Sequence, residues 1–318
     1  MGVSDLHLVA RGKSHIIIIL SKKSLSLQNE AMKKNKINKL KILRLTLGII
    51  LTTLLTALFI DFNRILPTEL HFIAHSQLIP AMLLAINGML TQLLILIVLI
   101  LLFGKLYCST VCPLGILQDF IAWLSKKIIK KKRYKYTKPL NVLRYVFLFA
   151  MIMFFVTGFG SLAAILEPYS IFGRIAVYLF KPVVLGINNL LAFIFELTGD
   201  YYFIEEEIFV LSTLFFVITL ISFLIVGVLS FLMGRKFCNT ICPVGTLLGL
   251  ASRFSLFKIR INKEKCNTCG LCEHICKAEC INSKAQSIDL SRCVVCFNCI
   301  GKCNKDAIRY GVMENVTN

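Results

Sequence analysis

Charged residues are scarce in this sequence, and acidic residues are the scarcest of them. Only 17% of the 318 residues are charged, and 17 Asp and Glu stand against 36 Lys and Arg, for a formal net charge of +19. Hydrophobic residues make up 57% of the chain, above the roughly 45–50% of ordinary soluble domains. This composition excludes a pair of ordinary soluble domains and is typical of an integral membrane protein.

The Lys and Arg residues are gathered in short blocks beside apolar stretches. Residues 33–44 contain six of them and residues 126–138 contain eight, whereas residues 61–77 contain one. By the positive-inside rule, this pattern predicts a multi-pass protein of a bacterial-type inner (plasma) membrane, with both termini in the cytoplasm. We expect the basic side chains to contact the lipid bilayer and we expect no nucleic acid partner.

Four charge-free stretches predict transmembrane helices. A charge at the centre of such a helix costs roughly 2.5–3.5 kcal/mol, so uncharged windows of this length are informative. The stretches are residues 45–60, 78–103, 145–166 and 208–233. A shorter apolar stretch at 183–195 is expected to be interfacial or re-entrant, because a crossing needs about 20 residues.

One motif, C-x-x-x-C-P, occurs twice at a separation of about 130 residues, each time after a charge-free stretch. The repeat predicts two helical hairpins, residues 40–125 and 141–257, joined by a basic linker at 126–140. The four cysteines of the motif are Cys108, Cys112, Cys238 and Cys242. They could form one four-thiolate site for a further cluster or another thiophilic metal, or they could be reduced thiols in structural turns.

Nine of the thirteen cysteines lie between residues 266 and 303, in two runs of the spacing C-x-x-C-x-x-C-x-x-x-C. Such spacings indicate metal ligands in a reducing compartment rather than disulfides. In two-cluster ferredoxins the fourth cysteine of each run binds the other cluster. The predicted ligand sets for two [4Fe–4S] clusters are Cys266, Cys269, Cys272 and Cys303, and then Cys293, Cys296, Cys299 and Cys276.

Two features depart from the usual two-cluster pattern. Lys277 and Asn304 stand where a proline normally follows the fourth cysteine of each run. Cys280 is an additional cysteine, which is an alternative to Cys276 as the distant ligand or else a free thiol. Structural zinc is an alternative for the whole group of cysteines. We predict an α+β two-cluster module at residues 258–311, followed by a tail at 312–318.

With its apolar spans, duplicated C-x-x-x-C-P and terminal double cysteine run, the chain resembles the membrane polyferredoxins of the NapH and NosR type. The resemblance covers roughly residues 40–310. It implies a membrane all-α fold, with four transmembrane helices as two repeated hairpins and a C-terminal ferredoxin-like module. It also implies quinol-dehydrogenase-like electron transfer between the quinone pool and an unidentified redox partner. A metal-reducing or assembly factor for a respiratory enzyme, and a zinc-binding membrane scaffold, are the alternative functions.

A quinone site is marked only weakly in the sequence. His71 and His75 lie one helical turn apart, and Gln77 follows them at the start of the second span. Glu167 closes the third span, where a carboxylate could take up quinol protons. An interfacial helix face and a solvated helix end explain the same residues.

The basic N-terminal segment, residues 1–39, contains no stretch long enough to cross a bilayer. Met32 stands directly before the first basic block. We expect Met32 to be the natural start and the first 31 residues not to be native.

Overall fold

The computed structural model describes residues 39–61, 67, 71–86, 88, 90–130, 132–198, 205 and 212–312. The side chains of His71 and His75 and the expected start at Met32 lie outside the described part. The chain divides into two units, Met1–Leu43 and Arg44–Asn318. The architecture below is that of the second unit.

Three helices in the described ranges are long and apolar enough to cross a membrane: Lys39–Ile60, Pro168–Glu196 and Thr213–Met233. The first and the last, which is α11, overlap the first and fourth predicted spans. Most of their large apolar side chains are exposed, as at Ile50 and Leu224. Such surfaces suit a lipid environment, because water is a poor solvent for them.

The second and third predicted spans are each formed by two shorter helices. The second consists of α3 (Leu78–Ile86) and α4 (Thr91–Phe103), and the third of α7 (Asn141–Val156) and α8 (Gly160–Leu166). Gly158, between α7 and α8, has a φ of +77°, which favours glycine and ends a helix. Hydropathy alone does not show these breaks, because it reports apolar content and not the continuity of hydrogen bonding.

The apolar stretch expected to be a short interfacial helix belongs to a longer one, so its expected length was wrong. α9 (Pro168–Ile175), the π-helical turn η2 (Ala176–Phe180) and α10 (Lys181–Thr198) follow one another directly. Glu167 caps the start of α9, since its carboxylate accepts hydrogen bonds from two backbone N–H groups. The π turn ends two residues before Pro182, where the normal helical hydrogen bond is missing.

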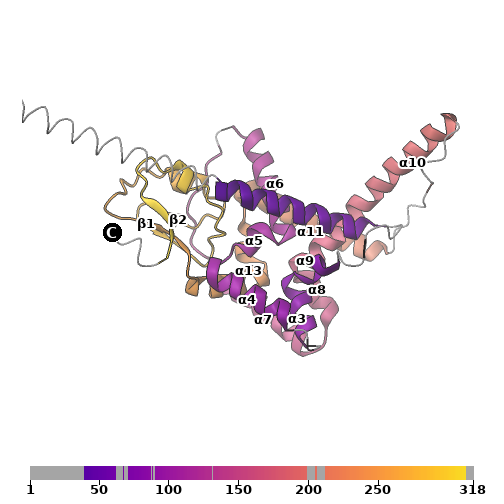
Figure 1. The fold of residues 1–318 in the computed structure, drawn as a ribbon, viewed down its shortest axis with the longest axis horizontal. Helices are drawn as coiled ribbons and strands as arrows, with labels where there is room; N and C mark the ends of the chain where they lie inside the picture. Colours follow the sequence, from indigo (N-terminus) through magenta and orange to yellow (C-terminus); the bar gives the residue numbers. More distant parts are fainter. Residues whose placement is uncertain are drawn as a thin grey trace, which may run out of the picture. The chain divides into compact units, whose positions relative to one another are not determined.

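The two copies of the C-x-x-x-C-P motif have the same local structure. α5 (Tyr107–Thr110) and α6 (Pro113–Ile128) in the first copy correspond to α12 (Lys236–Thr240) and α13 (Pro243–Ala251) in the second. In both, a glycine with a φ of +68° ends the preceding apolar helix, and a proline occupies the first turn after the second cysteine. α6 packs along α11, and α13 contacts both α7 and α4, so the two copies lie against each other's helices (Figure 1).

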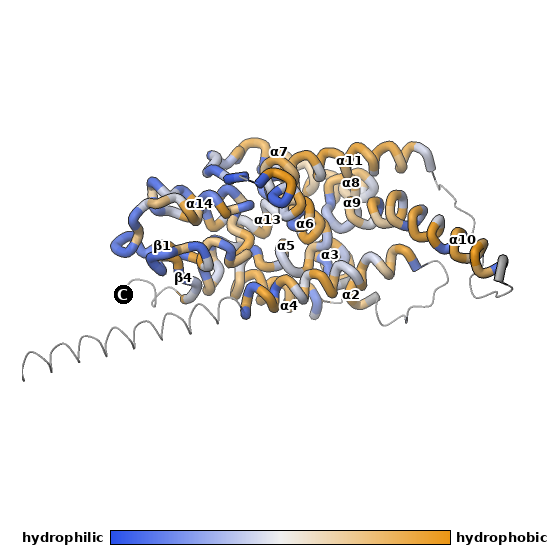
Figure 2. Tube along the Cα trace, turned by 90° about the horizontal axis from the view of Figure 1, so that it is seen from above, coloured by the Kyte–Doolittle hydropathy of each residue, from blue (hydrophilic) through white to orange (hydrophobic). Residues whose placement is uncertain are grey.

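The cysteine-rich module is closed by its own first and last strands. β1 (Lys258–Ile261) pairs antiparallel with β4 (Ile308–Gly311), and the short strands β2 (Ile281–Asn282) and β3 (Ser287–Ile288) form a second pair. Each cysteine run contains one short helix, α14 (Leu271–Ile275) or η4 (Ile300–Lys302). Figure 2 shows the change from apolar helices to this hydrophilic module.

The module is joined to the helices by backbone hydrogen bonds. After α13 and the turn η3 (Ser252–Phe254), the N–H groups of Leu256 and Phe257 donate to the carbonyls of Leu101 and Leu102, at 2.8 and 2.9 Å. These carbonyls belong to the last turn of α4, where no intrahelical donor remains. The last carbonyl groups of α4 therefore accept hydrogen bonds from the segment that leads into the module.

Candidate metal centre

One cavity in the module is lined by cysteines of both runs. It has a volume of about 170 Å³. The cysteines at its wall are Cys266, Cys269, Cys272 and Cys303. Cys269 is exposed, Cys272 is buried and the other two are half-buried. The last cysteine of the second run therefore lies with the first three of the first run, close to the protein surface.

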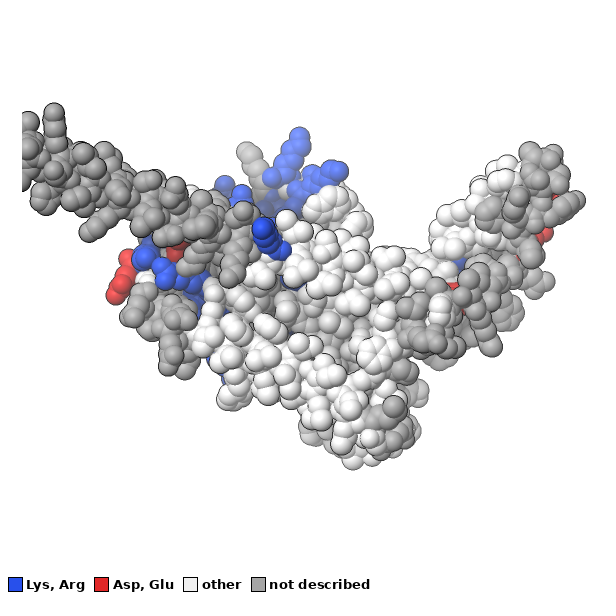
Figure 3. Space-filling view, viewed as in Figure 1, with Lys and Arg blue, Asp and Glu red and all other residues white. Residues whose placement is uncertain are grey.

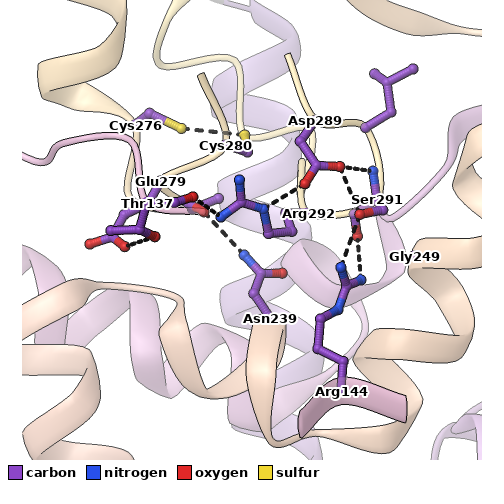
Figure 4. A network of polar contacts seen from close by, with 12 residues as sticks. Thr137, Arg144, Asn239, Gly249, Cys276, Glu279, Cys280, Asp289, Ser291 and Arg292 are labelled. Carbon is purple, nitrogen blue, oxygen red and sulfur yellow. Dashed lines mark hydrogen bonds and ion pairs between the residues drawn. The ribbon is translucent and has the colours of Figure 1, made fainter. Parts of the chain in front are cut away.

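A second, smaller cavity is lined by the remaining cysteines of the module. They are Cys276, Cys280, Cys293, Cys296 and Cys299. All of them except Cys293 are buried. The Sγ atoms of Cys276 and Cys280 lie 3.5 Å apart (Figure 4). Both thiols reach this cavity, so either can serve as its distant ligand.

The two cysteine runs share an unusual backbone conformation. Thr268 and Val295, directly before the second cysteine of each run, have φ values of +53° and +49°. Gly270 and Phe297, directly after it, have φ values of +76° and +61°. A left-handed β-branched residue costs about 1–3 kcal/mol and persists only where its surroundings demand it. The same conformation in both runs indicates that each loop wraps the same kind of group.

The four cysteines of the C-x-x-x-C-P copies form a third group. All four are free thiols, and each is only 2–3% exposed. The thiols of Cys108 and Cys112 lie within electrostatic range of Cys238. A hydrogen bond from the Cys242 thiol lowers the pKa of Cys238 and so favours its thiolate. The structure therefore brings the two pairs together across the repeat.

Two glycines to which the sequence pattern alone assigned no role make this arrangement possible. Gly115 and Gly245 each follow the second cysteine of their copy by three residues. A Cβ atom at either would lie 2.1 Å from the carbonyl oxygen of the first cysteine, Cys108 or Cys238. Only glycine allows the helix after the motif to start against the preceding turn. The signal was present in the sequence, because the same residue occurs at the same offset in both copies.

Asp119 of α6 is surrounded by buried cations. Its carboxylate lies 2.6 Å from Arg235 Nε, 2.5 Å from Lys277 Nζ and 3.6 Å from Arg44 Nη1. Burial acts to raise the pKa of Asp119, but the charges of Arg235 and Lys277 hold that pKa well below its usual range. Asp119 is therefore an anion that faces three positive charges.

Lys105 occupies in the first copy the position of Arg235 in the second, and both side chains are fully buried. Its ammonium group donates to Asn239 Oδ1 and to the Ser291 carbonyl, both at 3.1 Å. Arg235 Nη1 in turn donates to the Cys108 carbonyl at 2.6 Å. Each of the two cations thus contacts the opposite copy, as an approximate two-fold relation requires.

A polar network fixes the second cavity to the helices (Figure 4). Arg144 of α7 donates from Nη1 to Ser291 Oγ at 3.1 Å. Asp289 accepts hydrogen bonds from Ser291 Oγ at 2.7 Å and from Arg292 Nε at 2.7 Å. Because Ser291 and Arg292 directly precede Cys293, these contacts position the second ligand set relative to α7.

Comparison with known proteins gives a match to the two segments that contain the C-x-x-x-C-P motif. A family described as a 4Fe-4S binding domain matches residues 87–132 and 215–262. Each matched segment contains one C-x-x-x-C-P copy. The internal repeat is therefore also recognised as two copies of one family pattern.

The chain is 27% identical to the ferredoxin-type protein NapH of Escherichia coli, over 68% of this chain and 66% of NapH. It is 26% identical to the methylamine utilization ferredoxin-type protein MauN of Methylorubrum extorquens, over 67% of this chain and 61% of MauN. It is 22% identical to the regulatory protein NosR of Stutzerimonas stutzeri, over 63% of this chain and 24% of NosR. The resemblance to the NapH and NosR type is confirmed. No solved structure matches the chain.

The thiol groups suit the iron–sulfur chemistry of the ferredoxin-type relatives. Within the described ranges, no three His, Cys, Asp or Glu side chains converge on a point where they could hold one metal ion. A cubane makes a different demand, because each of its four irons takes its own thiolate. Four thiols spread around a cavity meet that demand, and in the second set the buried Lys277 lies within electrostatic range of Cys296.

The candidate quinone residues are only partly placed. Gln77 is buried, its amide donates to the Val111 carbonyl at 3.1 Å, and its oxygen accepts from the Tyr107 hydroxyl at 2.9 Å. Glu167 is buried and caps α9. Both side chains therefore have partners within the fold. The backbone of His71 and His75 forms α2 (His71–His75).

Proposed function

We propose that this protein is a membrane-bound iron–sulfur electron carrier that works between the quinone pool and a one-electron redox protein. The observation that carries the proposal is the pair of module cavities, one lined by four cysteines and one by five, each drawing on both runs. The similarity to ferredoxin-type proteins supports it. The quinone is included in the proposal as the membrane redox partner because the chain resembles the NapH and NosR type of membrane polyferredoxin.

The two ligand sets would each hold one [4Fe–4S] cluster, a group that takes up and releases single electrons. The cysteines around the first cavity reach the surface at Cys269, which is exposed. Those around the second are mostly buried and are fixed to the helices through Ser291. The module therefore offers an outer ligand set for exchange with a partner and an inner set on the side of the helices.

The reaction proposed for the membrane part is oxidation of a quinol. Each quinol that becomes a quinone releases two electrons and two protons. The electrons leave one at a time, so two equivalents of the one-electron carrier protein are reduced, and the protons pass to water. Gln77 and Glu167, with His71 and His75, are the proposed quinone-binding residues. In support, Gln77 hydrogen bonds to Tyr107, and Glu167 lies within electrostatic range of the same tyrosine.

We place the module and both termini on the cytoplasmic side of the membrane. The exposed basic residues in the last turn of α6 and in the segment after it support this orientation, by the positive-inside rule. They are Lys127, Lys130, Arg133, Lys135 and Lys138. Figure 3 shows the Lys and Arg side chains of that face gathered toward the end that carries the module, while most of the remaining described surface is uncharged.

Anaerobic purification with iron, sulfide and zinc analysis and EPR of the reduced protein tests the proposal. Cys269→Ser and Cys296→Ser should each remove about four irons and a different EPR signal, because each substitution removes a ligand of one cubane. Addition of a menaquinol analogue should reduce the wild-type clusters. Stoichiometric zinc without iron would make the module a zinc scaffold. Reduction by dithionite but not by the quinol analogue would remove the quinone from the proposal.

A further inference from the structure

Two segments of the module, residues 276–281 and 303–308, follow the same backbone path. In each, the residue three positions after the first cysteine is left-handed, with φ values of +51° and +46°. A strand, β2 in the first segment and β4 in the second, begins two positions later. Lys277 and Asn304 therefore occupy equivalent positions, each directly after the fourth cysteine of its run.

These two equivalent positions differ in charge and in burial. Lys277 is positively charged and buried, whereas Asn304 is neutral and exposed. The ammonium group of Lys277 lies within electrostatic range of Cys296, a cysteine of the inner ligand set. A buried charge acts on its neighbours with little screening, whereas water and salt screen an exposed one. The inner ligand set therefore has a buried positive charge at a position where the outer set has a neutral side chain.

Lys277 is held in place by the helical core. Its Nζ atom lies 2.5 Å from a carboxylate oxygen of Asp119 on α6. Its backbone carbonyl accepts a hydrogen bond from the Arg235 amide at 2.8 Å. Gly234 makes room for this contact, because a Cβ atom there would lie 2.5 Å from the same carbonyl oxygen. The core therefore fixes both the backbone and the charged end of Lys277 relative to the inner cysteines.

The formal charges in this contact group do not cancel. Arg44, Arg235 and Lys277 share the carboxylate of Asp119, and three cations with one anion leave a net charge of +2. The ion pairs formed by residues next to the inner cysteines each join one cation to one anion: Arg292 to Asp289, and Lys236 to Glu279. Local net charge is one of the factors that set the reduction potential of an iron–sulfur cluster. The positive excess on the core side of the inner set therefore favours the reduced state there.

We propose that Lys277, held by Asp119, raises the reduction potential at the inner ligand set and so favours the transfer of an electron from a quinol to that set. The inference rests on the electron-carrier function proposed above. Each one-electron reduction adds one negative charge to the inner set, and the fixed ammonium group of Lys277 stabilises that charge by coulombic attraction. The quinol supplies the electron, and its protons pass to water. At the outer set, the neutral Asn304 provides no such stabilisation.

The test is a redox titration of the full chain, purified without oxygen and followed by EPR, in which the inner signal is the one that Cys296→Ser removes. Lys277→Gln removes the positive charge, so the equilibrium constant for reduction of the inner set should fall about tenfold. For a one-electron couple this is a midpoint more negative by about 59 mV, while the outer signal keeps its midpoint. Lys277→Arg retains the charge and should retain the inner midpoint. Lys284→Gln, which removes an exposed lysine of the same module, should change neither midpoint.

Asp119→Asn separates an electrostatic role from a purely structural one. It makes the contact group more positive, so the inner midpoint should rise, and the double variant with Lys277→Gln, which keeps the net charge at +2, should return close to the wild-type midpoint. A lysine that only anchored the module would lower the thermal midpoint of unfolding without these opposite shifts in potential.

The comparison of Lys277→Gln with Lys277→Arg decides the question where Asp119→Asn does not fold. An unchanged inner midpoint in Lys277→Gln, or an equal shift of both signals, would overturn the inference. Absence of both iron signals from the wild type would instead overturn the function proposed above.

Discussion

The module and the helical core hold their cysteines in opposite ways. In the module, the thiols stand on loops whose backbone is left-handed at matching positions, and one of them, Cys269, is exposed. In the core, two thiols lie within the short helices α5 and α12 and two stand at the starts of α6 and α13, and all four are at most 3% exposed. The module therefore defines its sites by strained backbone, whereas the core defines its site by packing and by buried charge.

The difference has a consequence for electron transfer. A loop site that reaches the surface can exchange electrons with a second protein. The four core thiols are enclosed by helices and lie near the buried cations Lys105 and Arg235, so they are insulated from water and do not reach a partner protein directly. Arg235 and Asn239 contact the chain directly after Cys276.

The largest effect is expected when the negative charge of Asp119, which lies among three buried cations, is removed. Asp119→Asn would leave Arg235, Lys277 and Arg44 without their carboxylate. Removing one partner of a buried ion pair costs about 3–5 kcal/mol, so the thermal midpoint of the detergent-solubilised protein should fall further than for any single glycine substitution in the core. Asp306→Asn, which changes an exposed carboxylate in the module, should leave the midpoint nearly unchanged. Equal midpoints for both variants would mean that buried charge does not define the core.

A second test concerns packing in the core. Gly115→Ala and Gly245→Ala each place a methyl group 2.1 Å from a backbone carbonyl oxygen. Overpacking of this kind costs about 1–3 kcal/mol, and the two losses should be similar because the two copies have the same geometry. The measurement is the thermal midpoint, with iron content followed in parallel.

Gly186→Ala is the matched control for this pair. Gly186 lies within α10, and a Cβ atom there would meet nothing within 4 Å. Alanine should therefore stabilise the protein by about 0.5–1 kcal/mol, because it restricts the unfolded chain more than glycine does. If one of the motif glycines tolerated alanine as well as Gly186 does, the two copies would not be equivalent.

The sequence predicts the membrane character and the resemblance to ferredoxin-type proteins well, because both depend on composition and on regular spacing. It also predicts that cysteines of the two runs belong together, and in the structure Cys266 and Cys303 line the same cavity. The breaks near Gly158 and after α3 are not visible in hydropathy. Nor is the start of the long helix at Pro168, since that depends on a single cap by Glu167.

The core site shows a different limit of sequence-based prediction. The repeat shows that Cys108 and Cys238 are equivalent, but equivalence alone does not show that they meet. Their meeting depends on how α6 packs on α11 and on the crossing contacts of Lys105 and Arg235. Such contacts join residues far apart in the chain, so local patterns carry no information about them.

The smallest effect is expected in the strained loops of the module. Thr268 is exposed and left-handed, so Thr268→Gly removes strain without removing buried contacts. A left-handed conformation costs a residue with a Cβ atom about 1–2 kcal/mol, and the gain from glycine is partly cancelled by its greater freedom in the unfolded chain. The unfolding midpoint under anaerobic conditions should rise by a small amount. Gly270→Ala, at a φ of +76° in the same loop, should lower it. If Thr268→Gly instead lowered the midpoint as much as Gly270→Ala, the loop would be held by side-chain contacts, and the contrast with the packed core would disappear.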